Sequence, residues 1–116
     1  MTSKREFIDY LRDMLDAVEK AGSFTKGMDA ERFRRDEKTI FAVIRALEVI
    51  GEAAKKIPPT VRDRYPQIPW REVAGIRDKL VHEYFGVNLD VVWKTVQEDL
   101  PKLKPVIQAM LTARDG

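Results

Sequence analysis

The sequence predicts an all-α protein, an up-down bundle of about four to five helices, and three observations support this class. Apolar residues recur at the i, i+3, i+4, i+7 spacing of amphipathic helices along most of the chain. Gly, Pro and capping residues interrupt this spacing at only a few points. No run shows the apolar and polar alternation of strands joined by hairpin turns. We treat residues 1–116 as a single domain, which is long enough to bury a core.

The first half of the chain predicts two helices. A capping box, Ser3-Lys4-Arg5-Glu6, precedes the first helix, which should end at Gly22. After a loop over residues 23–28, Asp29 can cap a second helix. Because the apolar stripe of this second helix continues from Phe33 to Ile57, we expect one helix of roughly thirty residues.

Prolines divide the second half. Pro58-Pro59 should stop the long helix, and residues 61–65 can hold only a short helical turn. Pro69 suits the first turn of the next helix, which carries the motif described below. A last helix begins after Asn88, and its stripe keeps its phase through two internal prolines, which predicts a kink and not a break.

Composition excludes several classes of function. The chain is 44% hydrophobic and 34% charged, as a soluble globular protein is, and its net charge of +2 favours nucleic acid only weakly. It has no cysteine, which excludes disulfides, thiolate metal sites and cysteine nucleophiles. No apolar run has the length of a membrane span, and the first residues do not resemble a signal peptide, so we expect a cytoplasmic protein. Cations outnumber carboxylates over residues 55–79.

The chemistry is expected in the stretch Arg77-Asp78-Lys79-Leu80-Val81-His82-Glu83-Tyr84, which contains the only histidine. At helical spacing, Arg77 and Tyr84 fall on the apolar stripe that Trp70, Val73 and Leu80 define. An arginine in that position either pairs with a carboxylate or lines a cleft that receives an anion.

His82 and Arg77 do not share a helix face. They are five residues apart, which is roughly 140° around an ideal helix. They can act on one ligand if the helix ends near His82, or if a second subunit brings its own copy. Gly86 and the predicted cap at Asn88 place a helix end close to His82, so both possibilities are open.

In this order, the residues resemble the HepT-like (DUF86) branch of the HEPN superfamily, small helical proteins encoded beside minimal nucleotidyltransferases in toxin–antitoxin pairs. The resemblance covers nearly the whole chain. It rests on four stretches: Ile50-Gly51-Glu52-Ala53-Ala54-Lys55, Ile68-Pro69-Trp70-Arg71-Glu72, the motif from Arg77 to Tyr84, and Asp90-Val91-Val92-Trp93.

The resemblance implies a metal-independent endoribonuclease, without a cofactor, that is the toxin of a type VII-like toxin–antitoxin pair. Arg77 and His82 would be catalytic, in a cleft between the subunits of a homodimer. The nucleotidyltransferase antitoxin would silence the toxin by adding AMP to Tyr84. Asp78 and Lys79 would support RNA binding, although many relatives have Asn at the position of Asp78.

The chemistry of RNA cleavage agrees with a dimer. Cleavage without a metal needs a base for the ribose 2′-OH, an acid for the leaving 5′-oxygen and a cation for the charge on phosphorus. One chain offers one histidine, whereas a two-fold dimer brings two histidines and two arginines to one cleft. Apolar faces around Trp70 and Trp93 could supply the dimer contact, or both side chains could belong to the core.

Two other functions remain open: a non-catalytic helical binding subunit of a minimal nucleotidyltransferase, and a helical dimer with only a structural role. A bundle enzyme with a carboxylate-bridged metal is disfavoured, because Lys79 stands where a Glu-x-x-His element ending at His82 requires a carboxylate.

Overall fold

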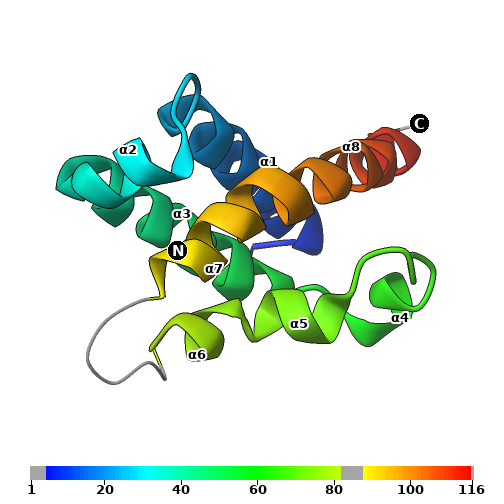
Figure 1. Cartoon of the computed structure of the whole chain (residues 1–116). Coiled ribbons are helices and arrows are strands. Elements are labelled where there is room, and N and C mark those ends of the chain that lie inside the picture. Colours follow the sequence, from blue (N-terminus) through cyan, green and yellow to red (C-terminus); the bar gives the residue numbers. More distant parts are fainter. Residues whose placement is uncertain (1–4, 82–87, 116) are drawn as a thin grey trace.

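The computed structural model describes residues 5–81 and 88–115, and all regular structure within these ranges is helical (Figure 1). The absence of strands from this part of the chain confirms the predicted all-α class. No described helix is long and apolar enough to cross a membrane. In chain order the helices are α1 Phe7–Phe24, α2 Ala30–Arg35, α3 Glu37–Lys55, α4 Pro59–Arg62, α5 Trp70–Ala74, α6 Ile76–Val81, α7 Leu89–Lys94, η1 Thr95–Asp99 and α8 Leu100–Asp115.

Helix α1 organises the core, because it packs against both α3 and α8. Helices α5 and α6 cover another part of α3, and α2 contacts both α3 and α7 (Figure 1). Burial of a large apolar side chain contributes about 1.5–3 kcal/mol, so the apolar stripes of the sequence hold these helices together. The largest fully buried side chains belong to one cluster, which includes Leu11, Met14, Phe33, Leu47, Ile50, Ile57, Ile68 and Ile107.

Helix α1 differs from its prediction at both ends. The expected cap Ser3 lies outside the described residues, and the helix begins after Glu6, whose backbone N–H donates to the Asp9 carboxylate at 3.0 Å. The helix continues past Gly22 to Phe24. The buried hydroxyl of Thr25 then donates to the Ala21 carbonyl oxygen at 2.9 Å and satisfies one of the last carbonyls.

The single long helix predicted after Asp29 is wrong, because Asp36 divides it into α2 and α3. Asp29 does cap α2, since its carboxylate accepts the Arg32 backbone N–H at 2.8 Å. Asp36 leaves the helical conformation, and its carboxylate accepts the Thr39 backbone N–H at 3.0 Å. The side chain of an aspartate can accept a hydrogen bond from a nearby backbone N–H, which stabilises a break in place of a continuous helix. The spacing of apolar residues does not reveal such a break.

The break lets α2 turn toward α7. The ring of the fully buried Phe33 lies 5.4 Å from the ring of Trp93, centroid to centroid. On the surface, the Arg34 guanidinium donates to one carboxylate oxygen of Asp90 through Nε at 3.1 Å and NH2 at 2.6 Å. These contacts tie α2 to the start of the last helical run.

The last run continues through both prolines, as predicted, but with a π-helical turn in the middle. Segments α7, η1 and α8 follow one another without interruption (Figure 1). The Leu100 N–H donates to the Thr95 carbonyl oxygen five residues back, which defines the π turn. Pro101 has no N–H to donate to the Gln97 carbonyl oxygen, so the regular α pattern cannot be completed at this point.

Candidate functional site

The motif stretch lies on two short helices, and not on the one predicted helix. Helix α5 ends at Ala74, and α6 begins at Ile76 after a turn at Gly75. The apolar positions Val73 and Leu80 are buried, as predicted. Arg77 is not: 52% of its side chain is exposed, because the turn at Gly75 offsets α6 from α5. The expectation that Arg77 occupies a buried stripe is therefore wrong.

Arg77 faces α3, where two carboxylates approach it loosely. Its Nε lies 3.8 Å from the Glu48 Oε2, and its NH1 lies 3.6 Å from the Glu52 Oε1. Glu52 also lies 3.6 Å from the Lys55 Nζ. All three distances exceed the roughly 2.7–2.9 Å of a direct charge-assisted hydrogen bond. The guanidinium is thus oriented by charge, while its N–H donors stay available to an anion.

The ion pairs of Arg77 with Glu48 and Glu52 stabilise the fold too little to explain why an arginine occupies this position. Glu48 is 30% exposed and Glu52 is 49% exposed, so solvent screens both pairs. Exposed pairs of this kind contribute at most about 1 kcal/mol. The two roles foreseen for the arginine, a carboxylate partner and an anion site, are compatible at this place.

A glycine sets how closely α6 approaches α3. A Cβ at the buried Gly51 would lie 2.8 Å from the Ile76 Cγ2, and 3.4 Å and 3.5 Å from the carbonyl oxygens of Val73 and Ala74. Glycine allows the helices to pack at this separation. Because Ile76 immediately precedes Arg77, Gly51 helps to position the guanidinium beside Glu48 and Glu52.

The other predicted site residues are only partly described. The Asp78 side chain is exposed on α6. Lys79 belongs to the same helix, and its side chain lies outside the described part of the structure. His82 and Tyr84 fall in residues 82–87, which are also outside it. The structure therefore brings Arg77 together with Glu48 and Glu52, and the roles of His82 and Tyr84 stay predictions.

Sequence reasoning did not assign Glu48 and Glu52 to the site. A signal was present, because the two residues are four apart and so share one face of α3. Nothing in the sequence, however, indicated that this face would meet α6. Glu52 belongs to one of the four stretches that carry the family resemblance.

Several other residues near the motif have structural roles. Arg62, which contributed to the basic region, donates from Nε to the Ile57 carbonyl oxygen at 2.8 Å and from NH2 to that of Ala54 at 2.9 Å. It therefore completes the end of α3. Trp70 is 8% exposed and donates from Nε1 to the Tyr65 carbonyl oxygen at 3.0 Å, which places it in the core. A dimer contact through Trp70 is thus not supported.

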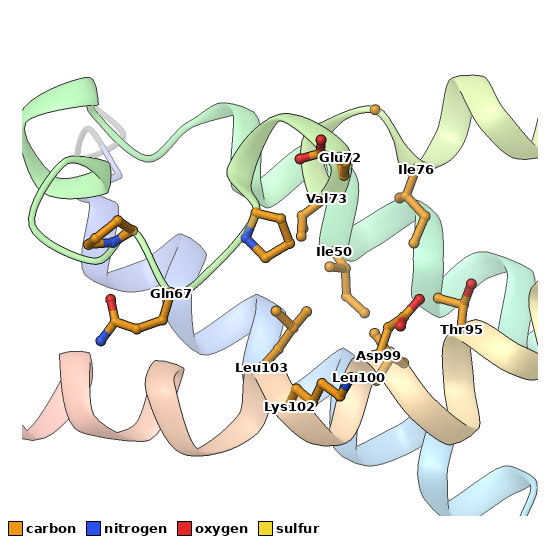
Figure 2. A pocket seen from close by; sticks show the side chains of 13 residues that line it. Ile50, Gln67, Glu72, Val73, Ile76, Thr95, Asp99, Leu100, Lys102 and Leu103 are labelled. Carbon is orange, nitrogen blue, oxygen red and sulfur yellow. The ribbon is translucent and has the colours of Figure 1, made fainter.

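A pocket of 540 Å³ opens on another side of Ile76, between α5 and the η1–α8 segment. Figure 2 shows its apolar wall, made by Ile50, Val73 and Leu103, and the polar side chains of Glu72 and Asp99. Arg77 is not among its lining residues. Among the described residues, no three Asp, Glu or His side chains gather into a cluster that could hold a metal ion.

The chain is similar to proteins named as ribonucleases. A family model described as Ribonuclease HepT-like matches residues 14–110. A protein of Thermococcus cleftensis named "Probable ribonuclease HepT" is 55% identical over 101 residues, which cover 87% of this chain and 92% of that protein. A protein of Methanocaldococcus jannaschii named "Putative RNase MJ1216" is 42% identical over 113 residues, or 97% of this chain and 93% of its own length. No solved structure matches the chain significantly.

Proposed function

Because the chain belongs to the HepT-like ribonuclease family of the HEPN superfamily, we propose that it is a metal-independent endoribonuclease and the toxin of a type VII-like toxin–antitoxin pair. The observation that best supports this proposal is the state of Arg77. It is half exposed and oriented by two carboxylates, without direct hydrogen bonds to either. Such a guanidinium can exchange its loose partners for a phosphate, which matches its planar fork of donors.

In the proposed reaction, Arg77 binds the scissile phosphate and stabilises the charge that develops on it. One His82 takes the proton of the ribose 2′-OH, whose oxygen attacks phosphorus. The bond from phosphorus to the 5′-oxygen breaks, and a second histidine gives a proton to that oxygen. The products are a 2′,3′-cyclic phosphate and a 5′-hydroxyl end. Since each chain has one histidine, the second is His82 of the partner subunit in a homodimer.

Arg77→Lys tests this role, because lysine keeps the charge and loses the planar fork. Cleavage of a labelled RNA should fall at least roughly tenfold, while the unfolding curve stays close to that of the wild type. If Arg77→Ala destabilises the fold and leaves cleavage by the folded fraction unchanged, Arg77 is a structural ion-pair residue and does not bind the scissile phosphate. Light scattering on the same samples should give twice the chain mass, and an active monomer would contradict the composite site.

We further propose that a minimal nucleotidyltransferase silences the toxin by adding AMP to Tyr84. The catalytic site and this modified tyrosine would then belong to one domain, residues 1–116. The added phosphodiester is negative and would compete with RNA for Arg77 and Lys79. Incubation with ATP and the neighbouring nucleotidyltransferase should increase the intact mass by one AMP, and Tyr84→Phe should abolish the increase. An unchanged wild-type mass would contradict the modification. Stable co-purification with the nucleotidyltransferase, without any RNA cleavage, would instead favour the non-catalytic binding subunit.

A further inference from the structure

A basic groove runs between α1 and α3, next to Arg77 but outside the residues predicted for the site. It encloses 250 Å³. Arg45, Val49 and Glu52 of α3 line it together with Lys56, the residue that caps the C-terminus of this helix, and their spacing of four, three and four residues puts them on one face. Arg45 and Lys56 therefore lie about 16 Å apart along the helix direction, with the aliphatic Val49 between them.

The carboxylates that line this groove have ion-pair partners, whereas two of its cations have none among the described residues. Its two carboxylates already have cationic partners: Asp13 lies 2.9 Å from Arg5 NH2, and Glu52 is paired with Arg77 and Lys55. Arg45 and Lys56 are exposed, and neither forms an ion pair with any residue that the structure describes. The groove thus presents two uncompensated cations to solvent, which attract a polyanion.

The α1 side of the groove carries an aromatic residue beside a further cation. The guanidinium carbon of Arg5 lies 4.6 Å from the centroid of the Tyr10 ring. This cation–π contact, together with the ion pair to Asp13, holds the planar guanidinium at the edge of the groove. Sites for single-stranded nucleic acid combine these elements: cations along a groove and flat groups on which bases stack.

The groove lies next to the candidate catalytic residue Arg77. Glu52 belongs to the groove lining and approaches Arg77 NH1 at 3.6 Å, so the groove and the guanidinium share one residue. We propose that this groove, with Arg45 and Lys56 as its phosphate contacts, is the track that binds single-stranded RNA beside the scissile phosphate. The inference rests on the proposed function, since it takes RNA as the ligand.

The test compares two double variants that each remove two exposed cations. Arg45→Ala/Lys56→Ala alters the groove. Lys26→Ala/Lys94→Ala is the matched control: Lys26 follows α1, Lys94 ends α7, and both are exposed. The probe is a fluorescent 2′-O-methyl oligonucleotide of about twelve nucleotides, which cannot be cleaved and fits a single-strand site. Binding is measured by anisotropy over a range of salt concentrations.

The groove variant should bind roughly tenfold more weakly than the wild type, and the slope of log K against log salt should fall by about 1.4, as the loss of two single-strand phosphate contacts requires. The control variant should match the wild type. Equal affinity and slope in the groove variant, or no oligonucleotide binding by the wild type, would overturn the inference. So would unchanged RNA binding with loss of nucleotidyltransferase binding, which would assign the groove to a protein partner.

The failure of this inference differs from the failure of the proposed function. A wild-type protein that binds the oligonucleotide through the groove but cleaves no RNA would refute the ribonuclease proposal and leave the groove assignment intact. A wild-type protein that cleaves RNA, with equal binding by the groove variant, would refute only the groove.

Discussion

Substitution of Gly51 should show how tightly α6 is held against α3. In Gly51→Ala, the new methyl group would meet the Ile76 Cγ2 at 2.8 Å, about 0.7 Å closer than an ordinary carbon contact. That atom is attached directly to the Cβ of a stiff β-branched side chain, so it moves only if χ1 rotates or α6 shifts. Overpacking of this kind costs about 1–3 kcal/mol, against a gain of about 0.5–1 kcal/mol for replacing glycine inside a helix. We expect a net loss of roughly 1 kcal/mol in the free energy of unfolding.

Urea unfolding of the wild type, Gly51→Ala, Ile76→Ala and the double variant can separate the clash with Ile76 from the gain of replacing glycine in a helix. Ile76→Ala removes the clashing Cγ2, so in that background Gly51→Ala should stabilise by about 0.5–1 kcal/mol, a reversal of sign. Gly22→Ala in α1 is the matched control, because a Cβ there has nothing within 4 Å, and it should also stabilise. Gly51→Ala should in addition slow RNA cleavage, since α6 carries Arg77. If Gly51→Ala stabilises the otherwise wild-type protein, the proposed clash between residue 51 and Ile76 is wrong.

Two further predictions concern the ends of α3. Asp36→Ala should be less stable than Asp36→Asn near neutral pH, because asparagine still accepts the Thr39 N–H. Hydrogen bonds from the backbone and side chain of Thr39 lower the pKa of Asp36 in the folded protein. The extra stability of the wild type over Asp36→Ala should therefore be complete above the pKa of Asp36 in the unfolded chain, and it should be lost as the pH falls through the lower pKa of the folded protein. Urea unfolding at several pH values would measure this difference in stability. At the other end, Arg62→Ala should cost roughly 1–2 kcal/mol, because the Ile57 and Ala54 carbonyl oxygens lose a charged donor. It should leave the salt dependence of RNA binding unchanged, and a reduced slope would contradict the capping role.

Periodicity predicted the elements that depend on packing. The stripe of α1, the cap at Asp29 and the continuity of the last run through Pro101 all follow from local rules, and the structure agrees with each. The family was also recognisable, because the motif stretch keeps its flanks in order, and the similarity to the HepT-like ribonucleases confirms it.

Breaks and partners between helices were harder to predict. Buried apolar residues occur on both sides of Asp36 and of Gly75, so the apolar pattern alone does not reveal that the helices break there. The pairing of Arg77 with Glu48 and Glu52 depends on how α6 crosses α3, which is a tertiary property. The choice between core and dimer contact for Trp70 likewise needed the tertiary structure, in which its Nε1 donates to the Tyr65 carbonyl oxygen of the irregular segment before α5.

Cleavage of RNA in EDTA by the purified protein, compared with His82→Ala, tests the central claim most directly. The wild type should cleave without added metal and leave 2′,3′-cyclic phosphate and 5′-hydroxyl ends. His82→Ala should keep its helical circular dichroism and its melting curve, yet lose at least roughly a hundredfold in rate, the usual contribution of general acid–base catalysis. A folded wild-type protein that cleaves no RNA, or a His82→Ala variant that cleaves as fast as the wild type, would contradict the account.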